Sequence, residues 1–193
     1  MSDASTRDEK EACLVAGMEE RGAFPMRRAR QRLMEDQARH LLAEHKATNG
    51  VLALCDGDVP YQVPLSYVYE GPSEAYPQGA VYFHCALKGR KLDIAAANPR
   101  ASFCVVTSDD VVPDEFTTYY RDVIAYGRLE IVEDENERLH ALMALGLAYA
   151  DGMPNKEELT KREIEKLGSA AHVLALRIEE LHGKQARELI GRA

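Results

Sequence analysis

The spacing of hydrophobic residues changes from a helical to a strand-like period near Asn49-Gly50. Between Arg30 and Lys46, apolar residues recur every three to four positions around a charged face, which predicts an amphipathic helix. We expect its buried stripe to consist of Leu33, Met34, Ala38, Leu41, Leu42 and His45. Asn49-Gly50 supplies residues that commonly end a helix, so a strand-rich region begins after it.

A period of two follows and predicts a β-hairpin. Val51–Cys55 is a short apolar strand, and Asp56-Gly57-Asp58 is a tight-turn signal. The second arm is Tyr61–Tyr69. Its apolar face consists of Tyr61, Val63, Leu65, Tyr67 and Tyr69. Proline cannot donate to a strand ladder and is confined to edges or bulges, so we expect the arm to be bulged or opened at Pro64. The free backbone groups there could bind a ligand.

The rest of the chain alternates strand and helix patterns. We expect strands at Ala80–Ala86, Arg100–Thr107, Tyr119–Glu133 with a bend at Gly127, and Ala171–Glu180, and loops at Gly71–Gly79 and Ser108–Glu115. Short helices are expected at Glu11–Arg21 and Leu92–Ala97, and longer ones after Asp134 and at Lys156–Leu167. Asp134 with Glu137 resembles a capping box, and the helix after it would bury Leu139, Leu142, Met143 and Gly146.

Six mainly antiparallel strands with helices beside them predict a mainly β, α+β fold in the form of a closed or partly closed barrel. A chain of 193 residues suits one such domain. We expect an N-terminal extension over residues 1–25, the barrel domain over residues 26–184 and a C-terminal tail over residues 185–193.

The charge and the cysteines narrow the function classes. With 32 acidic and 24 basic residues the net charge is −8, which disfavours non-specific nucleic-acid binding. The polar first residues predict no secretory leader, and no apolar run reaches the ~20 residues of a membrane span. The scattered Cys13, Cys55, Cys85 and Cys104 predict free thiols in a reducing cytoplasm, with no metal site.

The residue types that could bind a ligand or take part in catalysis cluster in Tyr82–Lys91. A strand ends in His84 and Cys85, and Gly89 then opens a helix among three cations, Lys88, Arg90 and Lys91. The first turn of a helix has unbonded N–H groups and a partial positive charge, glycine permits close approach, and cations add charge-assisted hydrogen bonds. The pattern indicates a phosphate-binding turn. The alternatives are a solvated helix start and a structural histidine.

Six stretches of the chain also carry a family resemblance. They are Met26-Arg27-Arg28, Asp56–Tyr67, Tyr82–Ala86 with Gly89-Arg90-Lys91, Asn98-Pro99-Arg100, Tyr120–Val123 with Gly127, and Arg177–Lys184. In order and spacing they resemble the nitroimidazole-resistance branch of the pyridoxamine 5′-phosphate oxidase-like flavoproteins. The resemblance spans roughly residues 26–184, and it resides in the order of the stretches more than in any one of them.

The resemblance implies a split β-barrel homodimer that binds FMN, or alternatively FAD, at the subunit interface. The strand Val63–Tyr67 (Val63, Pro64, Leu65, Ser66 and Tyr67) would lie along the isoalloxazine ring, with Tyr67 as the one tyrosine expected to stack on it. The turn His84–Lys91 would hold the ribityl phosphate, and Tyr120 and Arg121 would line the pocket or reach it from the partner subunit. Asp122 stands where the family often has serine, which removes a hydroxyl contact to the flavin.

Three functions remain open at this stage. The first is an FMN-dependent oxidoreductase that reduces nitroaromatic compounds, with His84 as phosphate ligand or proton donor. The second is a flavin-binding or redox-sensing protein without turnover. The third is a haem-binding split barrel with His84 as axial ligand. Pyridoxamine-phosphate oxidase activity itself is not expected, because the arginine-rich signatures of that oxidase are not evident.

Overall fold

The computed structural model describes residues 28–44 and 49–191. The chain divides into two compact units, Met1–Arg30 and Gln31–Ala193, and the account below concerns the second. The predicted helix Glu11–Arg21, the extension 1–25 and the stretch Met26-Arg27 lie outside the described residues, as does His45.

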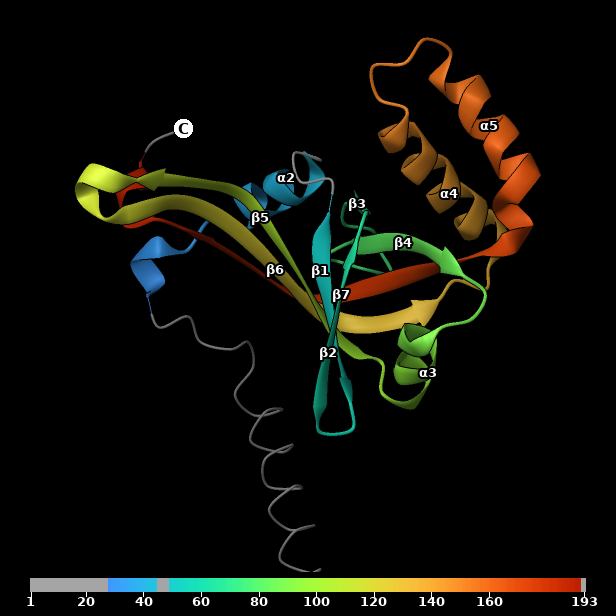
Figure 1. The fold of residues 1–193 in the computed structure, drawn as a ribbon, viewed down its shortest axis with the longest axis horizontal. Helices are drawn as coiled ribbons and strands as arrows, with labels where there is room; N and C mark the ends of the chain where they lie inside the picture. Colours follow the sequence, from blue (N-terminus) through green and yellow to red (C-terminus); the bar gives the residue numbers. More distant parts are fainter. Residues whose placement is uncertain (1–27, 45–48, 192–193) are drawn as a thin grey trace, which may run out of the picture. The chain divides into compact units, whose positions relative to one another are not determined.

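A single antiparallel sheet organises the second unit (Figure 1). Its seven strands are β1 Gly50–Asp56, β2 Val59–Leu65, β3 Val68–Glu70, β4 Ala80–Ala86, β5 Arg100–Val112, β6 Thr117–Ile131 and β7 Ala171–Gln185. Their spatial order is β2-β1-β5-β6-β7-β4-β3. The mixed α+β class is therefore confirmed, but the structure has seven strands where the sequence predicted six. The extra strand arises because the predicted arm Tyr61–Tyr69 divides into β2 and β3.

The break between β2 and β3 shows that the sheet curls on itself. These two strands are its opposite edges, yet only Ser66 and Tyr67 separate Leu65 from Val68. A flat sheet of this size would be roughly 30 Å wide at about 4.8 Å per neighbouring strand. Three Cα steps of about 3.8 Å reach at most about 11 Å. The edges must therefore lie close together, as in a barrel left open between β2 and β3.

The inside of the curled sheet holds the main core. The predicted apolar face of the hairpin arm is confirmed: Tyr67 and Tyr69 belong to this core, and Tyr61, Val63 and Leu65 pack against it. The largest fully buried side chains are Phe83, Phe103, Leu42, Leu52, Leu129, Leu174 and Leu176. Tyr67 and Phe83 both meet Phe103 edge-on, with ring centroids 4.9 Å apart. A second, smaller cluster lies on the other face of β4 and β7, against α4 (Glu135–Tyr149).

Strand β5 continues through most of the predicted loop Ser108–Glu115. It runs to Val112 and pairs with β6 as far as Thr117, with a register shift between Val106 and Ser108. A 3₁₀ turn, η2 Pro113–Glu115, closes this hairpin. The loop prediction was wrong because Ser108 continues β5 with its hydroxyl buried, and Asp109 and Asp110 lie on a two-stranded ribbon where their side chains remain in solvent.

The predicted bend at Gly127 is confirmed as a register shift. Tyr126 pairs with Glu180 and Gly127 with Ile178, so that β7 carries one extra residue. A Cβ atom on Gly127 would lie 1.9 Å from the carbonyl oxygen of Arg177. Only glycine permits this approach of β6 to β7.

The first described α-helix is shorter than predicted. Helix α2 spans Glu35–Ala43, not Arg30–Lys46, after a 3₁₀ turn η1 Ala29–Gln31. Arg32 instead bridges to Lys184, and the Leu33 N–H donates to the Gly183 carbonyl at 2.9 Å, so this segment is extended against β7. Met34 was wrongly placed in the buried stripe, since its side chain is 69% exposed.

The remaining helices follow their predicted ranges closely. They are α3 Arg90–Ala97, α4 Glu135–Tyr149 and α5 Lys156–Leu167, and the structure adds two 3₁₀ turns that were not predicted, η3 Gly168–Ala170 and η4 Arg187–Leu189. The buried residues of α4 are Ala141 and Leu145, whereas Leu139 is exposed, so the predicted stripe was shifted. Within the described residues, no helix combines the length and the apolar character that crossing a membrane requires.

Candidate functional site

The turn before α3 has the geometry expected of an anion-binding turn. Gly89 is the N-cap of α3, with φ of 155°, and no side chain caps the helix. Nothing lies within 4 Å of the position that a Cβ atom on Gly89 would occupy. The Leu92 and Asp93 N–H groups donate to the Gly89 carbonyl, so the N–H groups of Arg90 and Lys91 are the ones that an anionic oxygen in this open space could reach.

The three cations of this turn have different roles. The Arg90 guanidinium forms an ion pair with Asp56 at 3.0 Å and lies 5.4 Å from the centroid of the Tyr61 ring. Within residues 28–44 and 49–191, neither Lys88 nor Lys91 has a carboxylate partner within ion-pair distance. Arg90 thus attaches the turn to the β1–β2 hairpin, and the two lysines leave their charge available.

Strand β2 is an edge strand with an uninterrupted register. Pro64 pairs opposite Val51, with no bulge, so the expected opening at Pro64 was wrong. Pro60 and Pro64 have the same parity along the strand, and proline is tolerated where its missing N–H faces the free edge. The carbonyl groups of this edge therefore outnumber its N–H groups. Pro64 is exposed, whereas Val63 and Leu65 direct their side chains toward the core.

Tyr67 and Ser66 have structural partners. The Tyr67 side chain is 3% exposed, and its hydroxyl donates to the Leu42 carbonyl at 3.0 Å. Burial raises the pKa of Tyr67 to about 12. The expectation that its ring stacks on a flavin was wrong, because the ring belongs to the core. The Ser66 hydroxyl lies 2.8 Å from Asn49 Oδ1.

His84 and Cys85 point to opposite faces of β4, as consecutive strand residues do. The His84 ring meets the Tyr149 ring at 5.9 Å between centroids and lines a cavity beneath α4 and α5. Cys85 is buried against the main core, where burial raises the pKa of its thiol and the nearby Lys91 charge lowers it. The His84 imidazole therefore lies on one face of β4. Cys85, whose thiol the Lys91 charge reaches, lies on the other face.

Tyr120 and Arg121 lie far along the sheet from the Gly89 turn. Tyr61 pairs with Leu54, Leu54 with Ala101, and Ala101 with Gly127, so Tyr61 and Gly127 lie at the same height across the sheet. Tyr120 is seven residues (127 minus 120) further along β6, roughly 23 Å at about 3.3 Å per residue. One chain alone does not bring these residues to the turn.

The neighbouring Asp122 and Lys184 offset each other. They form a cross-strand pair between β6 and β7, and the Lys184 ammonium lies 5.1 Å from the centroid of the Tyr120 ring. Burial raises the pKa of Asp122, and the Lys184 charge lowers it. Lys184 therefore offsets the negative charge that Asp122 adds to this end of β6.

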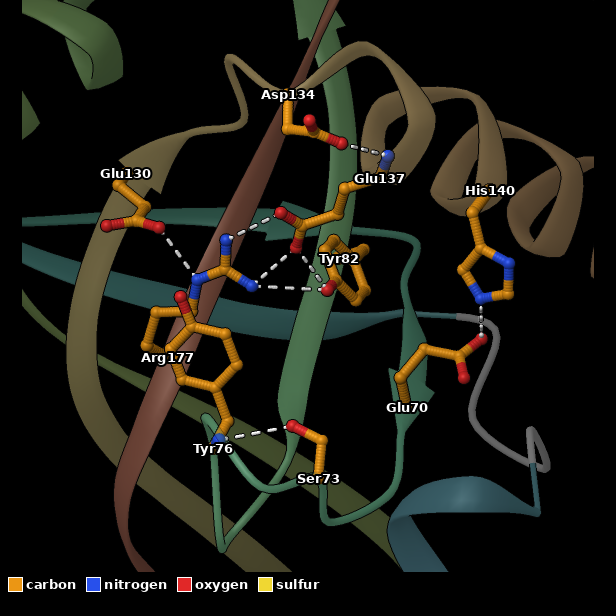
Figure 2. A network of polar contacts seen from close by, with 9 residues as sticks. All are labelled: Glu70, Ser73, Tyr76, Tyr82, Glu130, Asp134, Glu137, His140 and Arg177. Atoms are coloured by element: carbon orange, nitrogen blue, oxygen red, sulfur yellow. Dashed lines mark hydrogen bonds and ion pairs between the residues drawn. The ribbon is translucent and has the colours of Figure 1, made fainter.

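A polar network around Arg177 was not predicted (Figure 2). Arg177 is 8% exposed and donates to Glu130 at 2.7 Å, to Glu137 at 2.6 and 3.1 Å, and to the Tyr82 hydroxyl at 3.1 Å. The Tyr76 ring lies across it at 4.2 Å. The network joins β4, β6, β7, α4 and the loop after β3, so its members come from segments far apart in sequence. The one available signal was an arginine inside the apolar strand at Ala171–Glu180.

Glu137 explains why the predicted capping box is only half formed. The Asp134 carboxylate accepts from the Glu137 N–H at 2.8 Å, as predicted. The Glu137 side chain, however, binds Arg177 and accepts from the Tyr82 hydroxyl at 2.5 Å. The hydrogen bond from Arg177 lowers the pKa of Glu137, while burial and then the bond to Glu137 raise the pKa of Tyr82 to about 12. Burial alone would lower the pKa of Arg177, but its carboxylate partners raise it.

A small polar cavity adjoins this network. It has a volume of about 340 Å³ and is lined by the loop after β3, Tyr82 and the pair formed by His140 and Glu70, 3.3 Å apart. The part of the chain that the structure describes holds no group of three histidine, cysteine or acidic residues that could bind a metal ion. Its cysteines, Cys55, Cys85 and Cys104, are free thiols.

Residues 35–185 match the family model described as pyridoxamine 5′-phosphate oxidase. This match covers most of the chain, and the protein therefore belongs to that family. The curled sheet is the split β-barrel of the family. A search of curated proteins finds none that matches.

Solved structures share the fold at low sequence identity. A Bacteroides thetaiotaomicron VPI-5482 protein provisionally assigned to 5-nitroimidazole antibiotic resistance has a TM-score of 0.58 and 18% identity, over 80% of this chain and 86% of its own. An FAD-binding protein from Mesorhizobium loti has a TM-score of 0.55 and 21% identity, over 80% and 96%. An FAD and heme binding protein from Mycobacterium smegmatis has a TM-score of 0.63 and 20% identity, over 81% and 74%. The predicted membership of the pyridoxamine 5′-phosphate oxidase-like family is thus confirmed by the family model, and the solved structures share the fold.

Proposed function

We propose that the protein binds FMN, with FAD as the alternative, and uses it as the redox centre of an oxidoreductase for nitroaromatic compounds. The observation that carries the proposal is the uncapped start of α3 at Gly89, with Lys88 and Lys91 available beside it. A phosphorylated cofactor is the ligand that such a turn fits. Family membership and the flavin-binding structural neighbours support the same class of ligand.

The phosphate of the cofactor would bind at Lys88, Gly89 and Lys91. Arg90 orients this turn, because its contacts with Asp56 and Tyr61 attach α3 to the β1–β2 hairpin. The free edge of β2 around Pro64 would border the isoalloxazine ring through backbone groups. Flavin supplies electron or hydride transfer when bound, and the protein supplies position, electrostatics and access.

The site would be completed by a second copy of the chain. Tyr120 and Arg121 lie too far along β6 to reach the Gly89 turn of their own chain, so their proposed contact with the flavin requires a homodimer. The outward face of β1 and β5 carries exposed apolar side chains, among them Val51 and Val106, which a partner would cover.

His84 is the proposed proton donor. Its side chain is exposed on β4, beside Tyr149, so a substrate could approach it. Its distance from a bound flavin depends on where the ring lies, so a direct role in catalysis stays a prediction. A role for His84 as phosphate ligand has less support. His84 faces one side of β4, and Cys85, which the Lys91 charge reaches, faces the other.

The test starts from the native full-length protein. We expect absorbance near about 450 nm, or its appearance on adding FMN, and we expect denaturation to release FMN or FAD that mass spectrometry identifies. Anaerobic mixing with NADH, NADPH or dithionite should reduce the flavin, and nitroaromatic compounds should reoxidise it. If no nitro compound reoxidises the reduced flavin, the function that remains is flavin binding or redox sensing without turnover.

Two further outcomes would contradict the proposal. One is the absence of flavin absorbance together with no uptake of added FMN. The other is a band near about 400 nm that disappears in His84→Ala, which would assign haem.

A further inference from the structure

Helices α4 and α5 enclose an apolar cavity over one end of β4 and β7. Its volume is about 500 Å³, within the usual range for small-molecule pockets. Figure 1 shows the two helices as a pair beside these strands. The lining includes Leu142 and Tyr149 from α4 and Ile164 and Leu167 from α5. Tyr149 and Leu167 are 58% and 49% exposed, so apolar surface faces the cavity and the solvent.

Two polar groups meet this apolar lining. Thr160 is 4% exposed, and its Oγ1 has no hydrogen-bond partner among the described residues. Its methyl carbon packs close to Gly146, where an added Cβ atom would lie 2.3 Å from it. His84 contributes an imidazole from β4. A buried hydroxyl without a partner is costly, so a ligand that binds it would gain that free energy.

The charges of the lining indicate a neutral ligand. Its one arginine and one acidic residue, Arg162 and Glu163, are adjacent on α5 and offset each other. We propose that this cavity binds a neutral, largely apolar small molecule that carries an aromatic ring and one hydrogen-bonding group. The ring packs between α4 and α5, and the polar group binds Thr160 or His84. This site does not include the Gly89 turn, but it shares His84, the proposed proton donor, with the proposed function.

The probe for the test is N-phenyl-1-naphthylamine, a neutral aromatic amine whose fluorescence increases in apolar surroundings. Titration into the native full-length protein should give saturable binding. Leu142→Trp, which fills the cavity, should weaken it at least tenfold, and Thr160→Val, which removes the hydroxyl while keeping the shape, about fivefold. Val111→Trp, at a residue 72% exposed on the β5–β6 hairpin, is the matched control and should bind as the wild type does.

Several results would overturn the proposal. They are no saturable binding by the wild type, equal weakening by Val111→Trp, and unchanged binding by Leu142→Trp with a native circular dichroism spectrum. Displacement of the probe by hemin with a band lost in His84→Ala would assign the cavity to a porphyrin instead. Loss of dimer in Leu142→Trp without probe binding would make it a subunit contact. The absorbance near about 450 nm of the same samples reports the flavin separately.

Discussion

The Gly89 turn and the Arg177 network both contain positive charge, but they differ in whether that charge has partners within the chain. Arg177 is buried and meets two carboxylates, a hydroxyl and an aromatic ring. The Gly89 turn leaves the Lys88 and Lys91 side chains and the backbone N–H groups of Arg90 and Lys91 without such partners among the described residues. A satisfied cluster stabilises the fold, whereas an unsatisfied one marks a place for a ligand. The predictions below test this division.

The largest expected effect is on stability, at the close approach behind Arg177. Gly127→Ala would place its Cβ atom against the Arg177 carbonyl, so β6 and β7 must separate locally. We expect a loss of about 3 kcal/mol in the free energy of unfolding. Urea denaturation followed by circular dichroism measures it. Gly71→Ala, at a glycine with no atom within 4 Å of its added Cβ, should unfold as the wild type does.

Replacement of the buried Arg177 guanidinium should lower the free energy of unfolding by somewhat less. Arg177→Met leaves Glu137, Glu130 and the Tyr82 hydroxyl without their donor, and we expect a loss of about 2 kcal/mol, since both carboxylates retain some contact with water. Arg128→Met, at an exposed residue of β6, is the control. FMN affinity should not change in Arg177→Met. A variant of full stability, or one that loses its flavin, would contradict the structural role.

The opposite result is expected at the open turn. The double variant Lys88→Ala/Lys91→Ala should bind FMN about tenfold more weakly, which corresponds to about 1.4 kcal/mol. Its unfolding should not change, because neither ammonium group is part of a described ion pair. Lys156→Ala/Lys166→Ala removes two exposed lysines from α5 and controls for net charge. Equal losses in both double variants would mean that general charge, and not this turn, holds the phosphate.

The smallest effect is a pH dependence at Glu137. Arg177 lowers the pKa of this carboxyl in the folded state, so its contribution is complete above the ordinary value near 4.5 and is lost as pH falls through the lower folded value. Glu137→Gln should be about 1 kcal/mol less stable than wild type at pH 7. The difference should shrink between pH 5 and about pH 3. Glu133→Gln, at an exposed carboxyl, should follow the wild type throughout.

Local patterns predicted the elements whose faces differ in solvent exposure and the short apolar strand that lies between turn residues. Lys156–Leu167 has the predicted bounds, because one side of this helix contacts apolar neighbours and the other does not. Ala80–Ala86 has them because it is a short, largely apolar run between turn residues, and the structure buries it on both faces. The β5–β6 hairpin was missed beyond Thr107, since a ribbon with solvent on both faces needs no alternation. The break at Ser66-Tyr67 was missed because alternation continues through it, although β2 and β3 lie at opposite edges of the sheet.

The candidate site was predictable only where its residues are contiguous. Lys88–Lys91 is one turn, and its glycine and cations are visible in sequence. Arg177, Tyr82 and Glu137 meet only after three distant segments have folded, so no local spacing indicates them. Tyr67 shows the converse error, because strand alternation placed it correctly in the core while the resemblance favoured a flavin contact.

The most direct test of the phosphate-binding turn compares FMN with riboflavin, which lacks only the phosphate group. Flavin-free full-length protein would be titrated with each, following absorbance and quenching of flavin fluorescence. We predict that FMN binds at least about tenfold more tightly, because the α3 N-terminus and the two lysines contact the phosphate. Equal affinities for the two flavins would contradict the account, and so would no binding of either.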